Sequence, residues 1–159
     1  MPTLGDVYRK FGETAEAAQL LETQLGNLLL EHDCIEADLL VSPDPDKATA
    51  IYDRINRKTL GQLIRSLGSV VDSVANLEQI LGDALAARNR LIHSFYLRHN
   101  LRRNSDDGRE VMLRDLATLH SSLLEAYKAV LLLSGVDLDQ IVTEKGEDAQ
   151  PSGYLPIRT

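Results

Sequence analysis

The sequence has no tryptophan, a single cysteine and only 4% aromatic residues in 159 positions. The single cysteine, Cys34, cannot form an internal disulfide, and without a Cys/His cluster it cannot anchor a zinc site. Because aromatic side chains are scarce, the core must be built from Leu, Ile, Val and Ala, which is a helical composition. Long apolar runs are also missing. The longest, Ala129–Leu133, falls far short of the ~20 residues that a membrane span requires.

The first residues, Met1–Glu13, are polar and of mixed charge, and they lack the apolar stretch that an export signal needs. We therefore expect a protein of the reducing cytoplasm, with no membrane span and no cofactor. The side chains of Glu31, His32, Asp33 and Glu36 have the chemistry of metal ligands. They lie near a helix end, where exposed side chains are expected instead, so we predict no metal site.

Acidic residues are absent from two stretches, although the chain carries a formal net charge of -7. These stretches, Arg54–Val71 and Ala84–Ser105, hold nine of the 17 Lys and Arg and none of the 24 Asp and Glu. If they meet in the fold, they form a local positive surface on a negative body, which suits a nucleic acid held at one place. The alternative is that each charge run is simply a solvated face. The acidic whole argues against general nucleic-acid binding.

Apolar residues recur with helical spacing throughout, and no stretch alternates as a strand does. We expect helices over Leu4–His32, Pro45–Arg57, Leu60–Leu67, Ser73–Leu101, Arg109–Ser134 and, shorter, Asp137–Lys145. Expected caps are Asp44 and Thr59, and Asp107 with Glu110 has the spacing of a capping box. The prediction is an all-α, up-and-down bundle of three long helices plus short helices, forming one domain over 1–145 with a flexible tail over 146–159.

The most informative segment runs from Arg88 to Tyr96, late in the fourth expected helix. Helical spacing places Arg88 near the middle of an apolar stripe. A guanidinium in that position must be paired with one of the carboxylates, reach an edge or line a cleft. Asn89, His93 and Tyr96 share a second face, by i,i+4 and i,i+3 spacing.

Small residues continue the second face towards the start of the helix, at Gly82 and Ala86. They allow another backbone to approach closely. We therefore expect a helix contact on this face, either within the bundle or between two subunits.

The string from Leu85 to Phe95, LAARNRLIHSF, resembles the signature of the HEPN superfamily. That signature is an Arg, commonly followed by Asn, and then a His four to six residues further on, within a helical bundle. The segment Thr59–Ile64 is also similar to segments of HEPN-like bacterial proteins. The resemblance implies an HEPN-like homodimer in which two motif helices face each other across a composite cleft. Many HEPN proteins are metal-independent endoribonucleases.

The resemblance also implies that Arg88 and His93 serve RNA cleavage, with Asn89 as the supporting polar residue. The chemistry suits these side chains, because a histidine can take the proton of the attacking 2′-OH. A fixed guanidinium can stabilise the charge on the phosphoryl oxygens. The product would carry a 2′,3′-cyclic phosphate. The side chains expected to bind the RNA are Arg90, Tyr96, Arg98, Arg102 and Arg103. His99, Arg102 and Arg103 either extend this basic surface or favour the end of a helix.

One position departs from the pattern of HEPN toxins that pair with a nucleotidyltransferase antitoxin. They often carry Tyr two residues after the His, where this chain has Phe95, with Tyr96 one position later. Two functions from different classes remain open. One is an endoribonuclease, as a toxin or defence component with an antitoxin or other protein partner. The other is a non-catalytic HEPN-like helical dimer that binds a protein or regulates by association.

Overall fold

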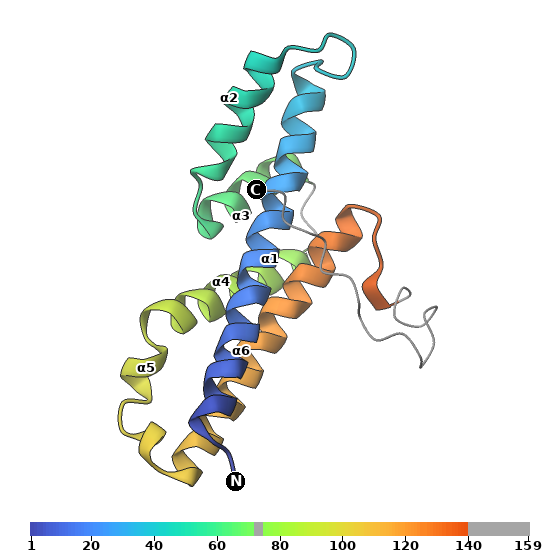
Figure 1. Ribbon diagram of the computed structural model, residues 1–159. Coiled ribbons are helices and arrows are strands. Elements are labelled where there is room, and N and C mark those ends of the chain that lie inside the picture. The colour runs from blue at the N-terminus through green and yellow to red at the C-terminus, as the bar shows by residue number, and fades with distance from the viewer. Residues whose placement is uncertain (72–74, 140–159) are drawn as a thin grey trace, which may run out of the picture.

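Residues 1–71 and 75–139 are described by the computed structural model, and their regular structure is entirely helical. The helices are α1 (Leu4–Glu36), α2 (Pro45–Asn56), α3 (Leu60–Val70), α4 (Ala75–His93), α5 (Phe95–Arg98), the 3-10 helix η1 (Arg102–Asn104) and α6 (Asp106–Leu133) (Figure 1). The predicted all-α bundle is confirmed. The helix expected over 137–145 extends beyond the described residues, and the tail expected over 146–159 lies outside them.

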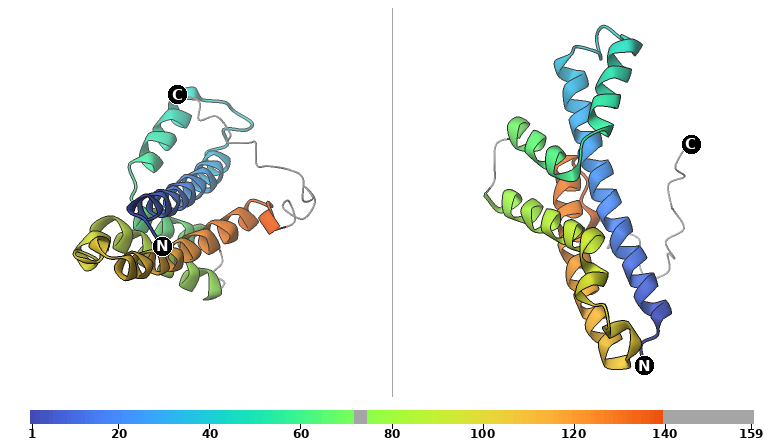
Figure 2. Two further views of the ribbon diagram at one scale, coloured as in Figure 1. Left: turned by 60° about the horizontal axis from the view of Figure 1, so that its bottom comes forward. Right: turned by 90° about the vertical axis from the view of Figure 1, so that its left-hand side faces the viewer.

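The two longest helices, α1 and α6, lie side by side and run in the same direction (Figure 1). At one end Arg109 Nε donates to the Pro2 carbonyl oxygen over 2.7 Å, and at the other Gln24 Nε2 donates to Ser134 Oγ over 2.8 Å. Helix α4 packs against α6 and brings the chain back towards the end where α1 begins. Helices α2 to α5 follow one another along one side of the α1–α6 pair (Figure 2).

The core lies between α1, α4 and α6 and is almost wholly aliphatic. Its largest fully buried apolar side chains are Val7, Leu21, Leu25, Leu60, Leu91, Phe95, Met112, Leu116, Leu123 and Val130. On α1 and α6 the buried residues follow one another mostly at intervals of three or four positions, so each helix turns one apolar stripe inward. Each such side chain contributes ~1.5–3 kcal/mol by leaving water, which is the main stabilisation available to a chain with few aromatics.

The predicted caps of α2 and α3 are confirmed. Asp44 Oδ1 accepts from the backbone N–H groups of Asp46 and Lys47, and Pro45 occupies the first turn. Thr59 forms a capping box with Gln62.

The predicted start of α6 is wrong. The helix begins at Asp106, three residues earlier than expected, and Ser105 Oγ accepts from the Gly108 N–H over 3.1 Å. Asp107 therefore lies inside the first turn, where it cannot act as the cap.

Among the described helices, α6 alone is long and apolar enough to cross a membrane by length and composition. The core helix of a soluble protein has the same length and composition. In this fold, α6 turns a stripe of eight buried residues, Gly108 to Leu131, towards the other helices. That stripe is the behaviour of a core helix.

The first turn of α6 packs closely on η1, and this contact depends on a glycine. A methyl group at Gly108 would overlap the Arg102 carbonyl group and lie 2.7 Å from the Arg102 Cα. Because backbone atoms cannot yield as a side-chain end can, we expect Gly108→Ala to destabilise the protein by about 1–3 kcal/mol. Denaturant unfolding measures this.

The matched control is Gly12→Ala, at an exposed position of α1 where a methyl group meets nothing within 4 Å. That change should stabilise the helix by about 0.5–1 kcal/mol, since glycine is a poor helix former. Equal effects of the two substitutions would contradict the packing of η1 on α6.

Candidate functional site

The motif helix ends at His93, so the prediction of one continuous helix over 73–101 is wrong. Ser94 leaves the helical conformation, with φ -139° and ψ -1°, and its Oγ donates to the Arg90 carbonyl oxygen over 3.3 Å. Helix α5 then starts at Phe95, whose ring is buried and lies 5.7 Å from the ring of Phe11 on α1. Serine side chains compete for helical carbonyl groups in this way, and the burial of Phe95 holds the chain in the new direction.

Arg88 reaches the edge of the apolar stripe and is paired there, which combines two of the three arrangements that the sequence allows. Its Nε donates to Glu22 Oε1 on α1 over 3.2 Å, and its Nη1 is 3.4 Å from Asn89 Oδ1. Glu22 keeps 32% of its side-chain surface exposed. The pair therefore stands at the rim of the core, where a further anion can reach the guanidinium.

Asn89 and His93 lie one turn apart on the solvent side of α4, and both are exposed. Gly82 and Ala86, which continue this face, are exposed as well, and a methyl group at Gly82 would meet nothing within 4 Å. We call these four residues the open face of α4. No described part of the chain covers it, so the expectation of a contact within the bundle is wrong for residues 1–71 and 75–139. A contact between subunits remains a prediction.

Tyr96 does not belong to the open face, because the chain turns at Ser94. Its ring lies 5.4 Å from that of Phe11 and 5.2 Å from that of Phe95. Burial raises the pKa of the Tyr96 phenol, and the neighbouring Tyr8 raises it further. The phenol is therefore neutral at physiological pH, and it is a hydrogen-bonding group at the margin of the site.

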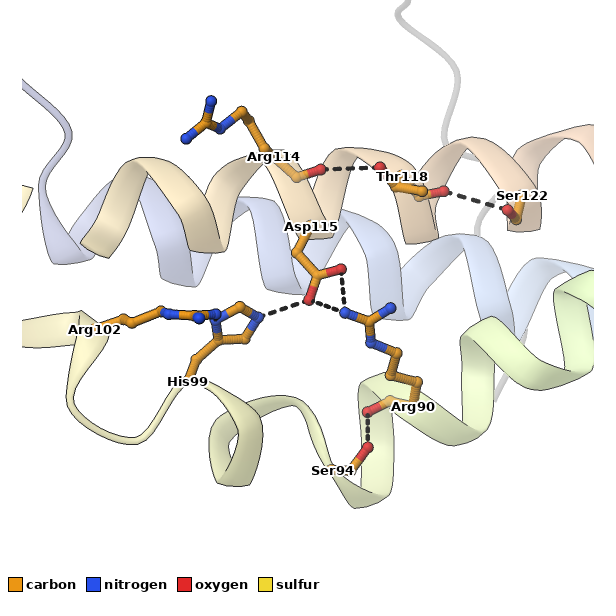
Figure 3. Close-up of polar contacts among 8 residues, drawn as sticks. All are labelled: Arg90, Ser94, His99, Arg102, Arg114, Asp115, Thr118 and Ser122. Carbon is orange, nitrogen blue, oxygen red and sulfur yellow. Dashed lines mark hydrogen bonds and ion pairs between the residues drawn. The ribbon is translucent and has the colours of Figure 1, made fainter. Parts of the chain in front are cut away.

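A buried polar network fixes the chain that follows the open face (Figure 3). The carboxylate of Asp115 on α6 lies 2.6 Å from His99 Nε2 and 2.6 Å from Arg90 Nη2. His99 is only 3% exposed, and its Nδ1 lies 3.1 Å from Arg102 Nη1. Because an arginine only donates, Nδ1 must accept this bond and the Nε2–H group must donate to Asp115. The geometry selects the neutral tautomer of His99.

The sequence suggested that His99 either extends a basic surface or favours a helix end. The first alternative is wrong, because His99 is buried, whereas His99 does lie at a helix end, as the C-cap of α5. Two signals point to the core. His99 follows Phe95 by four residues, and its ring packs 4.6 Å from the Phe95 ring. Asp115 directly precedes Leu116 and so lies beside the buried stripe of α6. A histidine and a carboxylate at such positions are expected to satisfy each other.

Other helices supply the carboxylates that the arginine-rich stretch lacks. Arg88 is paired with Glu22 and Arg90 with Asp115, while Arg103 Nη2 donates to the Tyr8 hydroxyl over 3.1 Å. Of the five arginines in 84–105, only Arg98 has no polar side-chain contact with a described residue. A stretch without acids in sequence is therefore partly neutralised in space. Roles for Arg90, Arg98, Arg102 and Arg103 in RNA binding remain predictions.

The two acid-free stretches approach each other beside α1. Glu22, which holds Arg88, and Lys58, which precedes α3, line one hollow of about 340 Å³. Helices α3 and α4 are also neighbours, since a methyl group at Gly61 would lie 3.6 Å from the Leu85 side chain. The backbones of the two stretches are therefore neighbours where α3 and α4 meet (Figure 2).

Metal-binding geometry is not found in the part of the chain that the structure describes, where no three His, Cys, Asp or Glu side chains gather to hold an ion. In the 31–36 segment, Asp33 instead accepts from Arg54 over 2.7 Å and contacts His32 at 3.2 Å. Comparison with known proteins adds no assignment: no family model, curated protein or solved structure matches this chain.

The Asp115 network predicts a large and local effect on stability. Asp115 is 12% exposed, and Asp115→Ala would leave the buried His99 N–H and the Arg90 guanidinium without their acceptor. We expect a loss of about 2–4 kcal/mol in the free energy of unfolding, measured with denaturant.

Glu110→Ala is the matched control, because Glu110 is exposed on the same helix and has no polar contact within the described residues. It should change the stability by less than about 0.5 kcal/mol. A similar small effect of both substitutions would show that Asp115 does not hold the chain after the motif.

Proposed function

We propose that this protein is a metal-independent endoribonuclease of the HEPN type, acting as a cytoplasmic homodimer in which the open faces of two α4 helices meet. The observation that carries the proposal is that Asn89 and His93 lie on a face of α4 that the rest of the described chain leaves uncovered, while Arg88 stands next to Asn89 at the rim of the core. The resemblance of the string from Leu85 to Phe95 to the HEPN signature gives the reaction. A toxin or defence role, with an antitoxin or other protein as partner, follows from the same resemblance.

In this proposal His93 takes the proton of the RNA 2′-OH as the oxygen attacks the adjacent phosphorus. The P–O bond to the 5′-oxygen of the next nucleotide breaks, that oxygen is protonated, and a 2′,3′-cyclic phosphate remains. Histidine suits the task because its ordinary pKa lies near neutral pH. His93 has no hydrogen-bond partner among the described residues of its own chain. The second subunit or the substrate is therefore left to orient its ring.

Arg88 stabilises the negative charge that grows on the phosphoryl oxygens. Glu22 binds the Nε side of the guanidinium and so fixes its orientation. The Nη1 group lies 3.4 Å from Asn89 Oδ1, a long contact that a phosphate oxygen can replace. Glu22 in this reading is a positioning residue, which holds Arg88 at the rim of the core. Asn89 supplies a second polar group for the same phosphate.

Solvent-exposed apolar side chains at the end of α4 and in the segment after it support dimerisation through the open face. Ile92 is exposed on α4, and Leu97 and Leu101, which follow the turn at Ser94, are each 78% exposed. Large aliphatic groups at neighbouring positions favour burial against a partner, at ~25 cal/mol per Å² removed from water.

A second function is favoured by the state of Arg88 and by the charge of the chain. Arg88 already forms an ion pair with Glu22, and the net charge of -7 raises the electrostatic cost of bringing RNA to the surface. In this alternative the open face serves association alone, and the protein is a non-catalytic helical dimer that binds a protein or regulates. The cleavage experiment separates the two.

Cleavage of RNA should depend on His93 and Arg88 and not on a metal. His93→Ala should lower the rate by roughly 10²–10⁴-fold, through loss of the proton transfer. Arg88→Ala should also remove most activity, yet change the free energy of unfolding by less than about 1 kcal/mol, because its partner Glu22 is partly exposed. The measurements are RNA cleavage in the presence of EDTA and thermal melts of each variant.

Arg114→Ala serves as the control in the same assay, because Arg114 is an exposed cation on α6 that points away from the buried network (Figure 3). It should retain full activity. Undiminished cleavage by His93→Ala, or loss of wild-type cleavage on chelation, would refute the mechanism.

The solution mass should be that of a dimer of the 17.6 kDa chain at micromolar concentration. Ala86→Glu places a charge in the middle of the open face and should shift the mass towards the monomer, because a desolvated charge opposes association. Ala117→Glu makes the same change at an exposed position of α6 and should stay dimeric. Analytical ultracentrifugation decides, and a monomeric wild type would rule out the composite site.

A further inference from the structure

The corner where α2 passes into α3 carries a cationic surface that the motif does not explain. Two adjoining hollows, of about 520 and 370 Å³, share Lys58 and Gln62. Four cations line them: Arg54, Arg57, Lys58 and Arg65. Asp53 is the single carboxylate among the lining residues, against these four cations. We call this surface the cationic corner.

Two of these cations are available to a ligand. Arg57 and Arg65 are exposed, and neither side chain has a polar contact with a residue in the described ranges. The other two are held in place: Arg54 by Asp33 at 2.7 Å, and Lys58 by Ser66 Oγ at 2.6 Å. The corner therefore combines two free guanidinium groups with an ammonium group whose position is fixed. Cations around hydroxyl and amide groups are a suitable lining for phosphates.

The third hollow, of about 340 Å³, lies next to the corner and shares Lys58 with both of the others. It has a different character, because Tyr52, with 54% of its surface exposed, lines it together with Asn27 and Asn56. An exposed aromatic face with neighbouring amides can stack a nucleobase and bond to its edge. Glu22, the partner of Arg88, lines the same hollow.

We propose that the cationic corner and the Tyr52 hollow form a second binding site for single-stranded RNA. The phosphates lie on Arg57, Lys58 and Arg65, and one base stacks on Tyr52. The site rests on the proposed function in that it takes RNA as the ligand, and the shared Glu22 places it next to Arg88 of the motif. A strand held there is led towards the open face of α4. Single-stranded nucleic acids are bound by this combination of a positive groove and aromatic platforms.

The first test removes the two free cations. The probe is fluorescein-labelled 2′-O-methyl oligouridylate, which cannot be cleaved because it has no free 2′-OH to attack the phosphorus. Binding to the wild-type chain is followed by fluorescence polarisation over a range of salt concentrations. Arg57→Gln with Arg65→Gln should weaken binding about tenfold or more. The slope of log K against log salt should fall by about 1.4, the loss expected for two phosphate contacts on a single strand.

The control for charge is Lys47→Gln with Arg114→Gln, which removes two exposed cations that line none of the three hollows. This variant should bind nearly as the wild type does. The control for folding is the thermal melt, which should be unchanged in both double variants because all four side chains are exposed.

The second test concerns the base. Tyr52→Ala should weaken binding of the same probe about tenfold without changing the salt slope, because stacking involves no counterions. Tyr52→Phe should keep the affinity, since the ring remains. Loss of affinity in both variants would mean that the hydroxyl, and not the ring face, makes the contact, and would overturn the stacking assignment.

The outcomes distinguish this proposal from the ribonuclease proposal. If the wild type binds no oligouridylate, or if both double variants bind equally well, the corner is not an RNA site, whatever the cleavage assay shows. If labelled poly-glutamate binds with the same dependence on Arg57 and Arg65 while the RNA does not, the corner recognises an acidic protein and the proposal is wrong. RNA binding that depends on the corner, in a protein that cuts no unmodified RNA, supports the corner and refutes the ribonuclease.

Discussion

The carboxylate of Asp115 is the group on which the geometry around the motif depends. It receives Arg90 from the motif helix and His99 from the segment beyond it, so it holds both ends of the turn at Ser94 against α6. A buried carboxylate is costly to desolvate, and two good donors at 2.6 Å offset that cost only where they are held in position. The aromatic contacts of Phe95 with Phe11 and His99 supply that rigidity. The polar network and the aromatic cluster therefore stabilise each other.

This arrangement determines what the motif presents to solvent. Because the chain turns away after His93, Tyr96 packs towards α1, and Leu97 and Leu101 stand in water beyond it. A straight helix would have continued the face of Asn89 and His93 through Tyr96. The turn instead ends the open face at His93, which becomes its last polar side chain. A partner that approaches this face meets small residues first, then Asn89 and His93, and then an apolar margin.

The spacing of apolar residues predicted where the helices lie, but it did not predict the turn at Ser94. A helix lies at each expected position in the described ranges, although the fourth is broken at Ser94. Asp44 and Thr59 are the caps that the sequence predicted, because capping depends on a few neighbouring residues. Ser94 carries no such local signal, since neither Gly nor Pro is near and the break is stabilised by distant groups on α1 and α6. The pairing of Arg88 with Glu22, 66 residues away, likewise depends on the tertiary structure. For the same reason, sequence spacing did not predict that His99 is buried, because its partner Asp115 lies on another helix.

The distribution of carboxylates in space, and not along the chain, decides which cations remain available to a ligand. Glu22 and Asp115 lie in other helices and take up Arg88 and Arg90, the cations of the motif nearest to the core. Arg57 follows the last residue of α2 and Arg65 lies on α3, both at the surface, where no described carboxylate pairs with them. In a chain of net charge -7, long-range repulsion of a polyanion is greatest where acids are near and least where cations are unpaired. On the proposed function, a polyanion is attracted first to the corner of α2 and α3, which adjoins the hollow lined by Glu22, the partner of Arg88. Initial attraction and close contact thus fall to different residues.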